Sequence, residues 1–189
     1  MHPSARAILH GQIVLLCSLL ICVFLKPHGL AANAGFSYFG TFLVTVIPYS
    51  AALLGGAYYC YQAATRITQR DLQPLRWGLL AIVPLLAIIV VTPYSVGTLF
   101  DWAHTTAGAL LFILQIVLSI WLVWKLHFRL RTSLLLILEV VAGVVCSIYV
   151  APDHGLLLQF EILFQLAFSA LMIYSLNLLD EKNAVSSDR

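Results

Sequence analysis

The chain has 189 residues, of which 61% are hydrophobic and only 10% are charged, and its formal net charge at pH 7 is +2. Soluble domains carry about 25% charged residues, so this much apolar surface cannot be hidden in one water-soluble core and must face lipid. The small net charge also gives no reason to expect a nucleic-acid partner, and the composition predicts an integral membrane protein.

Long apolar runs recur from the first residues to the last, each near the roughly 20 residues that cross about 30 Å of hydrocarbon. They are continuous rather than alternating, which favours helices over barrel strands. The first run resembles a signal peptide, but it is long enough to span and Lys26-Pro27 interrupts any cleavage site, so we expect it to be retained. The sequence predicts one all-α domain over 1–189, with transmembrane helices at about 7–25, 38–65, 77–92, 101–125, 132–150 and 156–179 and a cytoplasmic tail at 180–189.

The connection after the first run, residues 27–39, is broken by proline and glycine but carries Phe36, Tyr38 and Phe39. Aromatic rings favour the headgroup level of a bilayer. We therefore expect this segment to lie in the interface or partly to re-enter the membrane.

The second run contains two features that shape helix packing. Pro48 removes a backbone donor and predicts a kink, as Pro84 does in the third run. Gly55 and Gly56 form a narrow face that lets another helix approach closely. This face is the place where we expect a membrane-protein partner or a second copy of the chain to dock.

Basic residues divide the two ends of the predicted bundle, because only Lys26 among the ten lysines and arginines falls between an odd-numbered helix and the next. The positive-inside rule then places both termini in the cytoplasm. We expect a multi-pass protein of the cell membrane. The residues on the predicted cytoplasmic side are Arg6, Arg66, Arg70, Arg76, Lys125, Arg129, Arg131, Lys182 and Arg189.

The opposite, outer side collects the side chains most suited to binding or chemistry. Asp101 and His104 share one face at the start of the fourth helix because they are three residues apart. We predict that an outward-facing polar cavity is lined by Tyr38, Asp101, His104, Asp153, His154 and Glu161. An alternative is a metal site of Asp101, His104, Asp153 and His154, since histidine and carboxylate are suitable zinc ligands. No HExxH or other fixed ligand spacing is present, and the alternative to any site is acidic residues at two helix starts.

Three polar residues fall deep inside predicted helices: Gln115, Glu139 and Gln165. An ionisable group at such depth costs a few kcal/mol on insertion scales, so Glu139 should face the bundle interior. It is interpreted either as part of a proton relay or polar substrate pocket, or as a protonated or hydrogen-bonded clasp between helices, for example to a tyrosine or glutamine.

The layout resembles that of the Frag1/DRAM/Sfk1-type proteins and the related bacterial DUF998 proteins. The residues that carry the resemblance are GFSYFG at 35–40, Phe100-Asp101-Trp102-Ala103-His104 and Glu161. It implies six helices, cytoplasmic termini and a role in lipid handling or membrane organisation, with membrane lipids as partners, and it supplies no catalytic residues. We expect no cofactor. The alternatives are an accessory or structural subunit of a membrane complex and a metal-dependent membrane hydrolase that uses the outer histidines and aspartates.

Overall fold

The computed structural model describes residues 1–31, 35–149 and 156–187, which form helices joined by short connections and contain no strand. Six helices are long and apolar enough to cross a membrane, so the chain is a multi-pass integral membrane protein with an all-α fold. The elements in chain order are α1 (Pro3–Leu25), η1 (Pro27–Ala31), η2 (Gly35–Thr41), α2 (Leu43–Thr65), η3 (Arg70–Leu72), α3 (Gln73–Val91), α4 (Thr98–Lys125), α5 (Leu130–Tyr149) and α6 (Leu157–Ser187).

Helix ends differ from the predicted bounds where local capping or aromatic burial decides them. α1 starts at Pro3, four residues before the predicted 7–25, because proline suits a first helical position and His2 Nδ1 accepts the Ser4 N–H at 3.2 Å. α2 begins at Leu43 rather than at 38, because the preceding residues form the separate 3₁₀ helix η2. α6 continues through the predicted tail at 180–189 as far as Ser187.

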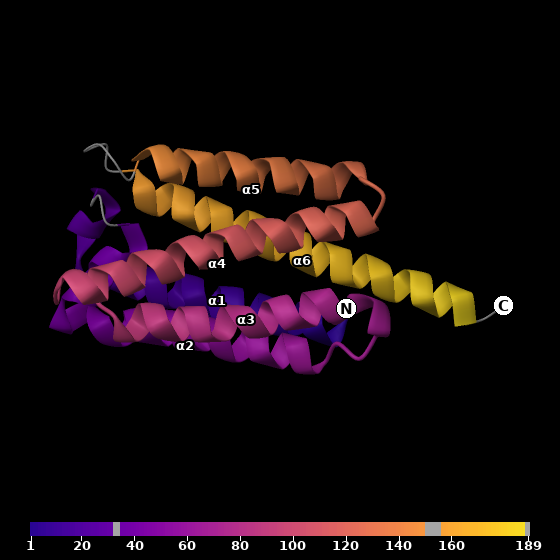
Figure 1. Cartoon of the computed structure of the whole chain (residues 1–189), viewed down its shortest axis with the longest axis horizontal. Coiled ribbons are helices and arrows are strands. Elements are labelled where there is room, and N and C mark those ends of the chain that lie inside the picture. Colours follow the sequence, from indigo (N-terminus) through magenta and orange to yellow (C-terminus); the bar gives the residue numbers. More distant parts are fainter. Residues whose placement is uncertain (32–34, 150–155, 188–189) are drawn as a thin grey trace.

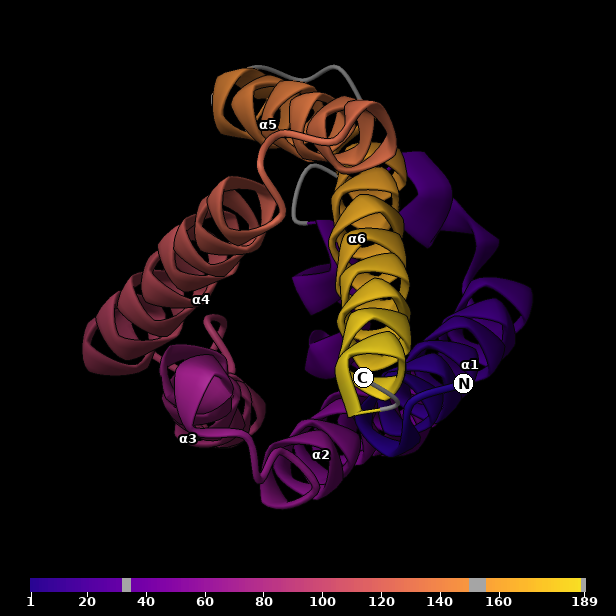
Figure 2. The ribbon, with the colours of Figure 1, turned by 90° about the vertical axis from the view of Figure 1, so that its right-hand side faces the viewer.

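The helices pack in chain order around a ring. Figure 2, viewed along the bundle, shows α1 to α5 following one another and α6 lying between α5 and α1. α1 packs on α2, α2 on α3, α3 on α4 and α5 on α6, while α6 also contacts α1 and α4. Short connections favour this arrangement of antiparallel neighbours. Both termini lie toward the same end of the bundle (Figure 1).

The two ends of the bundle differ in chemistry. We call the end with the start of α1, η3 and the α4–α5 connection the basic end. The end with η1, η2 and the connection at 92–97 is the aromatic end. All described lysines and arginines except Lys26 belong to elements at the basic end. Which end faces the cytoplasm stays a prediction.

Gly55 allows α1 to lie close to α2. A Cβ at Gly55 would lie 2.7 Å from Val14 Cγ1 of α1, whereas a Cβ at Gly56 would lie 3.7 Å from Leu86 Cδ1 of α3. The narrow face is therefore used for packing within the chain. Docking of a partner through Gly55 and Gly56 stays a prediction.

Candidate functional site at the aromatic end

The short helix η2 folds in against the transmembrane helices and organises the aromatic end. Phe39 is fully buried, and its carbonyl oxygen accepts a hydrogen bond from Thr45 Oγ1 at 2.6 Å. The rings of Phe36 and Tyr49 lie 5.0 Å apart between centroids. Burial of aromatic surface of this kind stabilises the segment strongly. The segment expected at the interface thus packs against the core.

Glu161 of α6 binds the start of η2. Its Oε2 accepts a hydrogen bond from the Phe36 N–H at 2.6 Å. The preceding residue, Gly35, has φ +55°, and a Cβ there would collide with the Glu161 carboxyl group. Only glycine meets both requirements without strain.

His104 of α4 fixes the other side of η2. Its Nδ1 lies 2.8 Å from the Thr92 carbonyl oxygen and its Nε2 lies 2.7 Å from Ser37 Oγ. A carbonyl oxygen only accepts, so Nδ1 carries the proton, and in the neutral ring Nε2 accepts the Ser37 hydroxyl proton. The ring also meets Tyr94 edge-on at 5.9 Å, and burial raises the pKa of the Tyr94 hydroxyl.

The structure brings together some members of the predicted outer cavity and separates others. Tyr38, His104 and Glu161 all belong to the assembly around η2, in which the Tyr38 ring packs on Phe42 at 4.8 Å. Asp101 lies one turn before His104 and is exposed. Asp153 and His154 lie outside the described residues. Among the residues described, no three His, Cys, Asp or Glu side chains form a group that could hold a metal.

The predicted deep polar residues behave in two ways. Gln115 and Gln165 pair reciprocally, each Nε2 donating to the other Oε1 at 3.1 Å, and so join α4 to α6. Glu139 of α5 is fully buried, and neither of its oxygens forms a well-made hydrogen bond. The buried hydroxyl of Ser119 on α4 is the polar neighbour of this carboxyl group. Among the described residues, neither a tyrosine nor a glutamine hydrogen-bonds Glu139, and a clasp between helices at this residue stays a prediction.

A row of polar residues on one face of α6 links these contacts, and the sequence alone did not group these residues together. Glu161, Gln165 and Ser169 follow one another at intervals of four residues and so share a helix face. Glu161 bonds η2, Gln165 bonds α4, and Ser169 Oγ donates to Gln12 Oε1 of α1 at 2.8 Å. The spacing of four was the available signal, but the partners lie far away in sequence.

A second feature missed by sequence reasoning is an apolar groove between α3 and α4. Its volume is about 340 Å³, and we call it the α3–α4 groove. It lies next to the His104 assembly: Thr92 bonds Ile88, a groove residue, through both its N–H and its Oγ1, and Ala103 adjoins His104. The groove is lined by Leu85, Ile88, Leu99, Trp102, Ala103, Thr106, Ala107 and Leu110.

No protein-family model, curated protein or solved structure matches the chain. The function must therefore be argued from the residues of the chain itself.

Proposed function

We propose that the protein handles membrane lipids, with one acyl chain lying in the α3–α4 groove and the lipid headgroup at the aromatic end. The single observation that carries this proposal is the position of the apolar groove directly beside the polar His104 assembly. A phospholipid needs an apolar site for its acyl chain and a polar site for its headgroup, separated along the membrane normal by about the length of one headgroup. The resemblance in layout noted from the sequence points to the same kind of role.

The groove has the composition expected of an acyl-chain site. Its lining side chains are apolar except for Thr106, and Leu99, Trp102 and Leu110 are exposed to the surroundings of the bundle. A groove on the lipid-facing side of a membrane helix is filled by lipid, since water has no polar partner there. An acyl chain held between two helices gains more van der Waals contacts than one in the fluid bilayer.

The polar assembly supplies the second half of the proposed site. Ser37, His104 and Thr92 form a continuous chain of hydrogen bonds from η2 to the end of α3. These groups can exchange partners with the phosphate or hydroxyl oxygens of a headgroup at this depth. Exchange would loosen η2 on the His104 side while Glu161 still holds the Phe36 N–H.

The test fills the groove without touching the polar assembly. Thr106 is exposed at the groove rim, and Thr106→Trp would place an indole where the acyl chain should lie. Ala109→Trp is the matched control, because Ala109 is exposed on the same helix but does not line the groove. Purified protein is labelled with a phospholipid that carries a photoreactive group in its acyl chain, and labelled peptides of α3 and α4 are quantified.

We expect Thr106→Trp to reduce labelling of groove residues several-fold and Ala109→Trp to leave it unchanged. Equal labelling of both variants and the unaltered protein would contradict the proposal. His104→Ala is an independent test, and the melting curve of this variant shows whether it folds. We expect it to retain less lipid during purification than the unaltered protein.

A further inference from the structure

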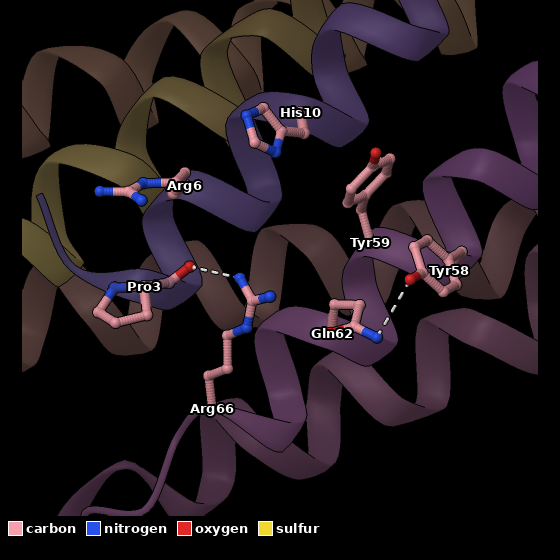
Figure 3. A pocket seen from close by; sticks show the side chains of 7 residues that line it. All are labelled: Pro3, Arg6, His10, Tyr58, Tyr59, Gln62 and Arg66. Carbon is pink, nitrogen blue, oxygen red and sulfur yellow. Dashed lines mark hydrogen bonds between the residues drawn. The ribbon is translucent and has the colours of Figure 1, made fainter.

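A basic groove lies at the other end of the bundle, between the first turns of α1 and the last turns of α2. Its volume is about 380 Å³, and we call it the α1–α2 groove. Figure 3 shows the Arg66 side chain reaching from the end of α2 toward Pro3, with Tyr58 and Gln62 bonded beside it. The groove is lined by Pro3, Arg6, His10, Tyr58, Tyr59, Gln62 and Arg66.

The residues that line this groove carry positive charge. Two of its lining residues are arginines and none is acidic. Within the described chain, neither guanidinium has a carboxylate oxygen within 4.0 Å, and the ion pair formed at this end joins Lys125 to Asp71. The first turn of α1 contains no acidic residue either, so the positive end of its helix dipole adds to the field.

Most hydrogen-bond donors in the groove remain available to a ligand. Arg66 uses one guanidinium nitrogen, Nη1, to donate to the Pro3 carbonyl oxygen at 3.2 Å, out of five N–H groups. The Tyr58 oxygen accepts from Gln62 Nε2 at 3.3 Å, which leaves its O–H free to donate. An arginine fork and a nearby phenol hydroxyl match the oxygens of a phosphate.

The groove also sits at the right depth for a headgroup and opens onto an apolar surface. Arginines at the ends of membrane helices and paired tyrosines belong to the interface. Ile47, Leu54 and Tyr58 recur on one exposed face of α2, so apolar surface continues from the groove toward the membrane centre. Free phosphate gains nothing from this surface, whereas an acyl chain does.

We propose that the α1–α2 groove binds the phosphate-bearing headgroup of an anionic phospholipid in the leaflet at the basic end. Basic pockets between transmembrane helices hold acidic headgroups by this combination of charge and hydrogen bonding. The site is separate from the α3–α4 groove and lies in the other leaflet. It selects a lipid by the charge of the headgroup rather than by the acyl chain.

The test compares two double variants that remove equal charge from the basic end. Arg6→Gln with Arg66→Gln alters the groove, whereas Arg129→Gln with Arg131→Gln removes two exposed arginines at the start of α5. Binding of fluorescent phosphatidylglycerol and phosphatidylcholine to the purified full chain is titrated in mild detergent. An excess of inorganic phosphate is the competitor that separates a lipid site from a free-phosphate site.

Removing both groove arginines should weaken phosphatidylglycerol binding roughly thirty-fold, because the loss of each arginine should weaken it about fivefold. The control double variant should change it little, phosphatidylcholine should bind weakly to all proteins, and inorganic phosphate should fail to displace the lipid. Equal losses in the two double variants, no loss in the groove variant, or displacement by phosphate would each overturn the proposal. All four arginines are exposed, so unchanged melting curves are expected and confirm that the variants fold.

The two lipid sites can fail independently. Thr106→Trp should leave phosphatidylglycerol selectivity intact, and the groove arginine variant should leave acyl-chain labelling of α3 and α4 intact. A loss of both readouts in either variant would mean that the two ends do not act as separate sites, and would overturn this inference.

Discussion

The reciprocal amide pair between Gln115 and Gln165 offers a sharp test of how the bundle is held together. Gln165→Leu removes both hydrogen bonds and leaves the Gln115 amide, which is 4% exposed, without a partner. A buried group left unpaired costs about 1–3 kcal/mol. Changing both residues to leucine removes the unpaired group together with the bonds, so the double variant should be more stable than the sum of the single losses indicates.

The magnitude follows from the number of bonds. Interhelical hydrogen bonds in membranes average about 0.6 kcal/mol and reach about 1.7. Two parallel bonds therefore predict a coupling free energy of about 1 kcal/mol, with an upper value near 3. In a chain of this length, 1 kcal/mol shifts the melting temperature by about 2–4 °C.

A double-mutant cycle measures this coupling from the free energies of unfolding of four proteins in one detergent. A second cycle that pairs Gln165→Leu with Gln69→Leu is the control, because Gln69 lies in the α2–α3 connection and its side chain makes no capping hydrogen bond. The control cycle should be additive. Coupling within about 0.5 kcal/mol of zero in the Gln115–Gln165 cycle would refute the structural reasoning.

Two further predictions concern the ends of the bundle. Gly35→Ala should lower the free energy of unfolding by at least about 1–2 kcal/mol, because alanine is strained at φ +55° and its Cβ would meet the Glu161 carboxyl group of α6. Gly108→Ala is the control in the same melting assay, because a Cβ at Gly108 would meet nothing within 4 Å. Burial lowers the pKa of His2 below its usual 6.5, so the unfolded chain binds more protons between the two values. Stability should therefore rise as pH increases through that window and level off above about 6.5, and His2→Asn, which keeps a capping side chain, should remove this contribution; an unchanged slope would contradict the prediction.

The candidate site shows where reasoning from sequence succeeds in part. The sequence pointed to His104 and Glu161 because both are polar residues near the ends of apolar helices, and both do contact the segment at 35–41. It did not pair them with their partners, because these are a backbone N–H and a serine hydroxyl that no motif distinguishes. Asp101 looked equivalent to His104 by spacing, yet Asp101 is exposed and His104 is buried.

The six helices were predictable from sequence alone because entry into a bilayer depends on the apolar content of each segment, which is a local property. The distribution of arginines and lysines between the two ends follows from the same helix order. Only the tertiary structure decided the polar neighbours: Gln165 with Gln115, Ser169 with Gln12, and Glu139 with Ser119. It also created both grooves. Such contacts depend on how each helix is rotated and on which helix lies beside it. The free energy of these interhelical contacts comes from segments that are far apart in the chain, so no local stretch of sequence determines it.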